Sequence, residues 1–473
     1  MCKLLLSPAI HFTIFETMKA KKIVKGIFLF SSLIVLAYGI RYCWFSFPII
    51  SGYSAKNACS CAFIQGRTKE SINNEELASF PLSIGNFEIN YKDSSVTGTV
   101  FGMAKRKAIF RYGLGCTLVN DFPENVVRSQ KLQVPFSNGV PDTVWSLPTP
   151  GDSLFIDTSK LNDAIATVFQ QEYNNKPVLT KAVLIVYKNR IIAEKYVPGY
   201  DQNSMFLGWS MAKSVTGTLI GILVKQGRLD PAKPAPIGVW RDAKDGKQQI
   251  SIENLLQQTS GLNFKEDYSS YSNATNMLFN KGDMAAYTES LPMKAKPGTE
   301  FYYSSGNSNI LSGIVRSATG EKDYHGFPYK ELFHKIGMYH TLLEPDASGS
   351  YVGSSYIWAS ARDYARYGLL YLNDGMWQGE RILPEGWVKK SATAPASNQF
   401  KNYGYQFWLN GYNGIDQSQR EFPQMPRDFF YADGYGGQRL YIIPSRQLVA
   451  VRLGLNKFDE QGFLQLLMDT VKE

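Results

Sequence analysis

The chain has 473 residues, of which 44% are hydrophobic and 19% charged, and its formal net charge is +9. This composition is typical of a globular protein with a large core and disfavours the disordered and fibrous classes. No dense block of lysine or arginine lies outside the N-terminal segment, so the positive charge argues against nucleic-acid binding.

Residues 1–50 are predicted to form a cytoplasmic stub followed by a signal or anchor segment. Four lysines within residues 19–25 precede an uncharged run at residues 26–40. This run is shorter than the about 20 residues of a spanning helix, but it extends to about Ile50 if Arg41 snorkels. No small-residue cleavage site follows directly, which favours an uncleaved signal-anchor over a cleaved signal. Either alternative predicts that the rest of the chain is exported to the periplasmic or extracellular side.

Residues 51–150 are predicted to form a β-rich extension that ends in a wrapping linker. The segments FEINYK, SVTGTVFGM and KAIFRYGLG alternate or are rich in strand-forming residues, with glycines between them. The segment FSNGVPDTVWSLPTPGD at residues 136–152 is rich in proline, glycine and aspartate, which is typical of a linker.

The cysteines lie only in the first quarter of the chain, at Cys2, Cys43, Cys59, Cys61 and Cys116. In an oxidising compartment, Cys59 or Cys61 could pair with Cys116, and free buried thiols are the alternative. The spacing of Cys59 and Cys61 fits neither a redox motif nor a zinc knuckle. The sequence therefore leaves the disulfide state open.

Residues 151–473 are predicted to form the main domain, in which strands come early and late and helices lie between them. This order predicts an α+β fold with one antiparallel sheet, built from both ends of the domain and flanked by helices, and with a mostly helical insertion at about 250–390. The expected elements are a helix at 161–173, a hairpin at 182–197 turning at Asn189, a helix ending at Gly227, a hairpin turning at Pro444 and Ser445, and a helix at about 459–471.

The most informative motif is Ser210-Met211-Ala212-Lys213, at the start of the run MAKSVTGTLIGILVKQG. Positions i and i+3 share one face of a helix, so Lys213 can lie beside the Ser210 hydroxyl. A serine needs an adjacent base to act as a nucleophile, and lysine supplies one without histidine. The helix start also favours developing negative charge. Taken alone, the pair is a weak signal, because an exposed serine and a solvated lysine have the same spacing.

Two later segments complete a candidate site. Residues 296–307 (KPGTEFYYSSGN) form a Pro-Gly turn that leads to Tyr303 at the head of an apolar helix. Residues 433–439 (DGYGGQR) form a glycine-rich turn that leads directly into the C-terminal hairpin.

With these three motifs in this order, the chain resembles the β-lactamase-related serine hydrolases. This family includes class C β-lactamases, D-alanyl-D-alanine peptidases, some esterases and the 6-aminohexanoate-dimer hydrolases. LLQQTSGL at 255–262 is similar to the family's LLTHTSGL, and residues 359–384 are similar to its SARDLARFGLLYLNGG segment. The resemblance covers about residues 160–458 and implies the β-lactamase/penicillin-binding-protein-like fold.

The resemblance implies a role for each motif. Ser210 would be the nucleophile, Lys213 its proton acceptor and Tyr303 the second acid/base. The backbone N–H groups of Ser210 and Gln438 would form the oxyanion hole. The implied substrate-binding residues are Ser305, Tyr435, Gly436 and Gly437.

The sequence departs from the family pattern at two positions. Ser305 stands where asparagine is usual, and Tyr435-Gly436-Gly437 lacks the lysine or histidine that grips a substrate carboxylate. Arg439 is a candidate for that role unless strand alternation turns it away. The serine at position 305 resembles the 6-aminohexanoate-dimer hydrolase branch, and the missing cation argues against binding of a β-lactam or D-alanine carboxylate. The expected reaction is hydrolysis of a small amide, peptide or ester.

Other activities remain open on the same fold. They are D-alanyl-D-alanine carboxypeptidase, esterase and β-lactamase activity, and, from another class, a catalytically silent peptidoglycan-binding sensor. The sequence has neither a G-x-S-x-G elbow nor an H-E-x-x-H motif, so His325, His334 and His340 predict neither a histidine triad nor a zinc site. No metal or cofactor is expected, and the oligomeric state is open.

Overall fold

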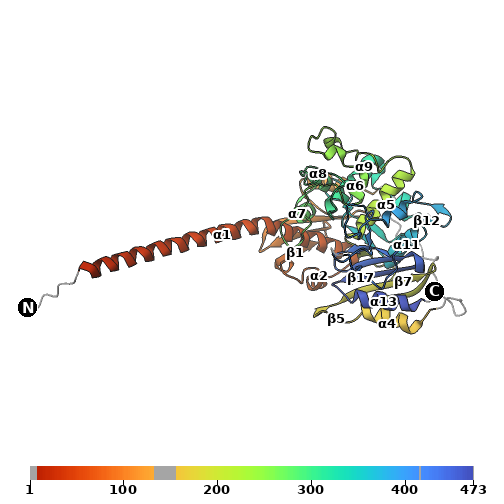
Figure 1. Ribbon diagram of the computed structural model, residues 1–473, viewed down its shortest axis with the longest axis horizontal. Helices are drawn as coiled ribbons and strands as arrows, with labels where there is room; N and C mark the ends of the chain where they lie inside the picture. Colours follow the sequence, from red (N-terminus) through yellow and green to blue (C-terminus); the bar gives the residue numbers. More distant parts are fainter. Residues whose placement is uncertain (1–7, 133–155, 415–416, 472–473) are drawn as a thin grey trace, which may run out of the picture.

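A computed structural model of the chain describes residues 8–132, 156–414 and 417–471. The linker expected at 136–152 lies outside these residues. One long helix, α1 (Pro8–Gln65), projects from a compact body and enters it with its C-terminal part (Figure 1). The arrangement therefore has two parts: an exposed helical rod and a body that holds every other described element.

The body is organised around an antiparallel sheet of strand order β14-β15-β16-β17-β7-β8. Strand β7 comes from the start of the main domain and pairs with β17 from its end, which confirms the sheet predicted from both chain ends. The β7–β8 hairpin turns at Lys188 and Asn189, which have φ of 48° and 61°. The strands are β7 (Leu179–Tyr187), β8 (Arg190–Tyr196), β14 (Trp408–Leu409), β15 (Phe430–Gly434), β16 (Gln438–Ile443) and β17 (Leu448–Leu455).

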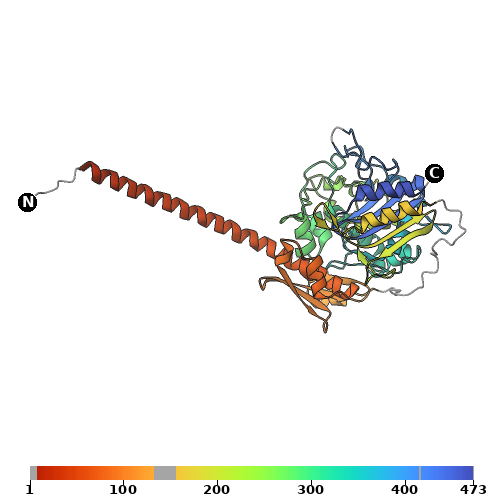
Figure 2. The ribbon, with the colours of Figure 1, turned by 90° about the horizontal axis from the view of Figure 1, so that it is seen from below.

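Helices cover both faces of this sheet. Along β7, Leu184 and Val186 belong to one apolar cluster, whereas Val183 and Ile185 belong to another on the opposite face. A strand buried on both faces needs a continuous apolar run, and β7 has one. Helices α5 (Met211–Lys225) and α11 (Ala361–Leu372) cover the first face, and α4 (Thr158–Val168) and α13 (Glu460–Thr470) cover the second (Figures 1 and 2).

The segment predicted to be a helical insertion contains short strands as well as helices. A three-stranded sheet of order β10-β11-β9 joins it to the residues before α5. The elements are β9 (Phe206–Leu207), α6 (Ile252–Leu256), α7 (Asn273–Asn280), α8 (Met284–Glu289), α9 (Ser305–Thr319), α10 (Glu321–Tyr324), β10 (Thr341–Leu343), β11 (Ile357–Ala359), β12 (Met376–Trp377), β13 (Glu380–Arg381) and α12 (Trp387–Ser391).

The prediction of strands and loops from residue 51 onward is wrong for residues 51–65, because α1 continues through them. The helix packs on a four-stranded sheet of order β1-β2-β3-β4 (Figure 2). Contact is close: a Cβ added at Gly98 would lie 2.1 Å from the Ser51 carbonyl oxygen. Small polar residues such as those of SGYSAKNACSC are poor helix formers alone, and tertiary packing overrides that tendency.

The remaining elements of the extension follow α1 in chain order. They are α2 (Lys69–Glu75), β1 (Gly85–Asn90), β2 (Ser95–Val100), β3 (Met103–Arg111), β4 (Gly115–Leu118) and α3 (Glu124–Ser129). Strands β1, β2 and β3 fall in the three segments in which strands were predicted. Since α1 crosses the expected boundary at residue 50, the division into segments 1–50, 51–150 and 151–473 stays a prediction.

A disulfide fixes α1 to the small sheet. Cys59 on α1 bonds to Cys116 on β4, with the Cα atoms 6.0 Å apart, while Cys61 is a buried free thiol. Of the two pairings considered from the sequence, the structure therefore contains the one through Cys59. The disulfide and the long apolar helix together suggest export, because disulfides persist in oxidising compartments.

A fully buried carboxylate connects α1, β4 and the body. Glu344 accepts a hydrogen bond from Lys56 Nζ at 2.6 Å, from the Ser60 hydroxyl at 2.7 Å, from the Cys116 amide at 2.7 Å and from Trp358 Nε1 at 2.8 Å. Burial lowers the pKa of Lys56, and Glu344 opposes that shift. The pair is thus a buried salt bridge in which each carboxylate oxygen has two donors.

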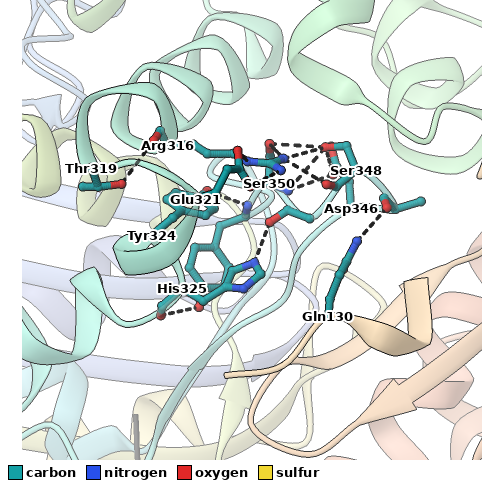
Figure 3. Close-up of polar contacts among 12 residues, drawn as sticks. Gln130, Arg316, Thr319, Glu321, Tyr324, His325, Asp346, Ser348 and Ser350 are labelled. Carbon is teal, nitrogen blue, oxygen red and sulfur yellow. Dashed lines mark hydrogen bonds and ion pairs between the residues drawn. The ribbon is translucent and has the colours of Figure 1, made fainter. Parts of the chain in front are cut away.

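A second polar cluster attaches the end of the extension to the body, at the C-terminal end of α9 (Figure 3). Arg316 donates to the Ser348 carbonyl at 2.9 Å, and Asp346 accepts from the Ser348 hydroxyl at 2.6 Å and the Ser350 amide at 3.1 Å. Gln130, next to α3, donates to a backbone carbonyl of the same loop at 2.9 Å. Burial raises the pKa of Asp346 to about 7. The catalytic candidates lie at the opposite end of α9.

We expect Glu344→Gln to destabilise the protein by roughly 3–5 kcal/mol, because it leaves the Lys56 ammonium buried without its counter-charge. The measurement is urea unfolding of the full chain in detergent. The control is the double variant Lys56→Met/Glu344→Gln, which removes both charges and should lose clearly less stability. Equal losses in the single and double variants would show that the ion pair does not hold α1 to the body.

Candidate active site

The turn before α5 presents Ser210 at the head of that helix, where Ser210 is the N-cap residue. Trp209 has φ of 47°, an unfavourable conformation for a bulky residue. Gly208 leaves no space for a side chain, since a Cβ there would lie 2.2 Å from the Tyr364 hydroxyl oxygen. Backbone strain of this kind persists only where surrounding packing enforces it, and it often accompanies function.

Lys213 lies one turn further along α5, with only 1% of its surface exposed. Its Nζ is 3.0 Å from Ser210 Oγ, 3.0 Å from Ser305 Oγ and 2.9 Å from the Ser354 carbonyl oxygen. Burial lowers the pKa of Lys213 to about 8, against the opposing charges of Glu266 and Asp433. Deprotonation at pH 7 then costs about 1.4 kcal/mol, compared with about 4–5 kcal/mol for a solvated lysine. Lys213 is therefore a usable base near neutral pH.

The aromatic ring of Tyr303 also lies beside this amine, with its centre 4.8 Å from Lys213 Nζ. Burial raises the pKa of Tyr303 well above its usual value, although a hydrogen bond with the Ser210 hydroxyl opposes the shift. The ring stacks on Trp408 at 5.2 Å and packs edge-on against Tyr403 at 5.6 Å. Tyr303 thus stays protonated where Lys213 titrates, so this phenol is suited to donate a proton. Ser210, Lys213 and Tyr303 lie together, as the motifs predict.

Ser305 begins α9 and keeps the contact with Lys213, although asparagine is usual at this position. Its hydroxyl donates to Glu266 Oε1 at 2.5 Å and lies 2.9 Å from the Tyr268 hydroxyl, and its amide donates to Glu266 Oε2 at 2.8 Å. Ser305 therefore connects the catalytic amine to a carboxylate.

Sequence reasoning missed Glu266 and Tyr268. The only signal in the sequence was their place in NFKEDY, directly after the TSGL segment. In a sequence, an acidic loop residue that contacts an active site looks the same as an ordinary surface charge. The sequence therefore could not distinguish these two roles for Glu266. The Ser354 carbonyl that accepts from Lys213 carries no sequence signal, because any residue can supply a backbone oxygen.

The hairpin between β15 and β16 approaches the nucleophile turn at Gly434, where an added Cβ would lie 2.1 Å from the Gly208 carbonyl oxygen. The next residue, Tyr435, is 59% exposed, and its ring packs edge-on against Trp209 at 5.5 Å. Because its side chain is exposed and contacts the residue before Ser210, Tyr435 lies at the rim of the candidate site.

The other hairpin residues that the family resemblance singled out have structural contacts. Gly436 and Gly437 have φ of 78° and 83°, and their carbonyls accept from Arg452 at 3.2 and 3.0 Å. The Gln438 side chain is buried and bonds across to Gly454 on β17, as donor to its carbonyl and as acceptor from its amide at 3.0 Å. These contacts fix the shape of the hairpin tip.

Arg439 does not face the site as a carboxylate anchor. It forms ion pairs with Glu460, at 2.6 Å from Nε to Oε1, and with Asp433. Strand alternation has turned its side chain toward α13, which carries Glu460. A substrate carboxylate would have to compete with two carboxylates of the protein for this guanidinium.

Comparison with known proteins identifies the family of the chain. The beta-lactamase family matches residues 165–462, which is more than half of the chain. The chain belongs to the beta-lactamase family. Its curated relatives include the 6-aminohexanoate-dimer hydrolase of Paenarthrobacter ureafaciens, 26% identical over 314 residues, which cover 62% of this chain and 76% of the relative. Protein flp of Staphylococcus aureus is 25% identical over 207 residues, covering 41% of this chain and 40% of that protein.

Solved structures show the same β-lactamase/penicillin-binding-protein-like α+β fold. A family VIII carboxylesterase superposes with a TM-score of 0.52 and 15% identity, covering 69% of this chain and 98% of the other. A Bacillus anthracis protein described as a candidate 6-aminohexanoate-dimer hydrolase gives 0.51 and 21%, covering 63% and 83%. The predicted fold and family are thus confirmed, and at these identities the superpositions show the fold alone.

The lowered pKa of Lys213 predicts how the reactivity of Ser210 depends on pH. Only the neutral amine can accept the serine proton, so labelling of Ser210 by a fluorophosphonate probe should rise with pH and level off above an inflection near 8. The measurement is the labelling rate of the full chain in detergent between pH 6 and about pH 10, with Ser210→Ala as the blank. A rate that does not change across this range would contradict the assignment of Lys213 as the base.

Proposed function

We propose that the protein is a serine hydrolase that cleaves a small amide or ester through an acyl-enzyme on Ser210. The observation that carries the proposal is the Lys213 amine, buried with a pKa of about 8 and 3.0 Å from Ser210 Oγ. Neutral Lys213 accepts the serine proton as Oγ attacks the substrate carbonyl. Tyr303, still protonated, donates to the leaving nitrogen or oxygen as its bond to the carbonyl carbon breaks. The Tyr303 phenolate is then reprotonated with the proton held by Lys213. Neutral Lys213 accepts a proton from the water that attacks the acyl carbonyl, and this proton passes to Ser210 Oγ as the acid is released.

The oxyanion is proposed to bind backbone N–H groups at the head of α5 and at the hairpin tip. Ser210 supplies the first, because the N–H groups of a helix start have no partners within the helix. The family resemblance assigns the second to Gln438. Gln438 pairs across the hairpin with Gly434, which closely approaches the Gly208 carbonyl, so the Gln438 backbone belongs to the part of the hairpin next to the nucleophile turn. One such donor is typically worth about 2.7–4 kcal/mol of transition-state stabilisation.

The substrate is proposed to resemble those of 6-aminohexanoate-dimer hydrolases more than β-lactams. Three observations support this choice: Ser305 in place of asparagine, Arg439 engaged by Glu460 and Asp433, and the relationship to the Paenarthrobacter ureafaciens hydrolase. Tyr435, Gly436 and Gly437 would form the wall of the substrate site beside Ser305. A linear amide or ester without a gripped carboxylate fits this surface better than a D-alanyl terminus.

We further propose that α1 stays attached as a membrane anchor with the catalytic domain on the exported side. Residues 24–65 form a helix long and apolar enough to cross a membrane, and its C-terminal part is buried in the body. Because exposed and buried parts belong to one continuous helix, the anchor and the catalytic domain would move as one unit.

We expect Lys213→Ala to lower hydrolysis by several orders of magnitude, as removal of a catalytic base does in other serine hydrolases. The measurement is turnover of short-chain esters, linear amides, D-amino-acid peptides and nitrocefin by the full chain. Lys225→Ala is the matched control, because Lys225 is an exposed lysine on the same helix. Near-normal turnover in Lys213→Ala would contradict the mechanism. A wild-type chain whose Ser210 never acylates would instead indicate a silent sensor.

A further inference from the structure

The apolar part of α1 ends where the body begins. Residues 26–45 contain one charged residue, Arg41, and at 1.5 Å per residue they span about 30 Å, the thickness of a bilayer core. Tyr42 and Trp44 near the outer end are exposed, at 49% and 75%, as in the aromatic belt of a spanning helix. The helix is buried in the body from Ile49 onward. Less than one helical turn separates the span from the body, so the body must rest on the bilayer surface.

Two exposed aromatic side chains, Phe101 and Tyr271, contact α1 at this point, and exposed Met103 follows Phe101 in the same hairpin; we call these three residues the collar. Phe101, Met103 and Tyr271 are 70%, 54% and 42% exposed. Phe101 contacts Phe47 of α1 with ring centres 6.0 Å apart, and Tyr271 contacts Phe45 at 5.0 Å. The collar therefore lies level with the outer end of the apolar span. Lys105, close to it on β3, is exposed and would meet lipid phosphates.

Phe101 has a backbone conformation that is unusual for a bulky aromatic residue. Phe101 and Gly102 form the two-residue turn between β2 and β3, with φ of 49° and 75°. Asparagine or glycine normally occupies both positions of such a turn, and a bulky residue there is strained. Apart from its contact with Phe47, the Phe101 ring remains 70% exposed, and insertion into a lipid interface would bury the rest of it.

The candidate active site lies close above the collar. One loop carries Glu266 and Tyr268, which contact Ser305, and a few residues later Tyr271, which contacts α1. On the helix itself, Tyr53 stacks against Trp209, the residue before the nucleophile, with ring centres 6.3 Å apart. Tyr53 is eight residues beyond Phe45, which corresponds to about 12 Å along the helix.

We propose that the collar docks the body on the lipid bilayer, and that the enzyme takes an amphiphilic substrate. Its apolar tail stays in the outer leaflet, and its amide or ester bond reaches Ser210 about 12 Å above the surface. The docking part rests on α1 and the collar. The substrate part rests on the proposed hydrolase function, so the two parts are tested separately.

Docking is tested by lipid-borne quenching of a label at the collar. An environment-sensitive fluorophore is attached to Phe101→Cys in the full chain, with Cys2 and Cys43 replaced by serine, and the protein is placed in phosphatidylcholine/phosphatidylglycerol vesicles. The matched control is Tyr112→Cys, which is equally exposed at 71% but lies about 30 Å away past the far end of β3. We expect blue-shifted emission and quenching by nitroxide-labelled lipid only for Phe101→Cys. The same response at both positions would overturn the proposal.

The substrate class is tested by comparing two p-nitrophenyl esters. One is soluble p-nitrophenyl butyrate, and the other is anchored in the vesicles by a dialkyl tail and a polar spacer of about 12 Å. We expect Phe101→Asp/Met103→Asp to lower turnover of the anchored ester at least tenfold and to leave butyrate turnover unchanged, whereas Tyr112→Asp changes neither.

The remaining outcomes of this comparison are also decisive. Equal loss on both esters, or no loss on either, would overturn the amphiphile proposal. If the wild-type chain hydrolyses neither ester, the hydrolase function has failed, and the quenching experiment alone decides the docking.

Discussion

Lys213 carries its amine into the core between Ser210, Ser305 and the Ser354 carbonyl, and the chemistry of the site depends on this burial. Desolvation lowers the pKa of the amine to about 8, so the amine can accept a proton near neutral pH. The same burial keeps Tyr303 protonated, which separates the two proton-transfer roles. One helix turn supplies both the proposed nucleophile and its proposed base, and the covering residues come from distant parts of the chain.

The long apolar helix α1 is part of the support of this site. Its buried half is fixed by the Cys59–Cys116 disulfide and by the Lys56–Glu344 ion pair, and Tyr53 packs on the strained Trp209. If α1 is the proposed anchor, a helix that also belongs to the core would set the height of Ser210 above the bilayer. The enzyme would then select substrates whose scissile bond lies at this height above the membrane, because the fold fixes the position of Ser210 relative to α1.

A few positions around the candidate active site differ from the pattern that the family resemblance implies. Ser305 retains the lysine contact that asparagine makes elsewhere, and adds a link to Glu266. The hairpin tip has glycine and tyrosine in place of a cationic side chain, and the nearby Arg439 is neutralised by Glu460 and Asp433. The site is therefore built without an evident anchor for an anionic substrate group, which separates it chemically from enzymes that bind a free carboxylate.

The sequence by itself determined the family, the antiparallel sheet and the group Ser210, Lys213 and Tyr303, because these depend on local periodicity and on motifs of fixed spacing. Only the tertiary structure decided that α1 continues through residues 51–65, since the small polar residues there become helical by packing against Gly85 of β1 and Gly98 of β2. It also decided which cysteine pairs with Cys116 and that Glu266 reaches Ser305. Such contacts join segments far apart in the chain, and local sequence preferences carry no information about which distant partner each residue meets.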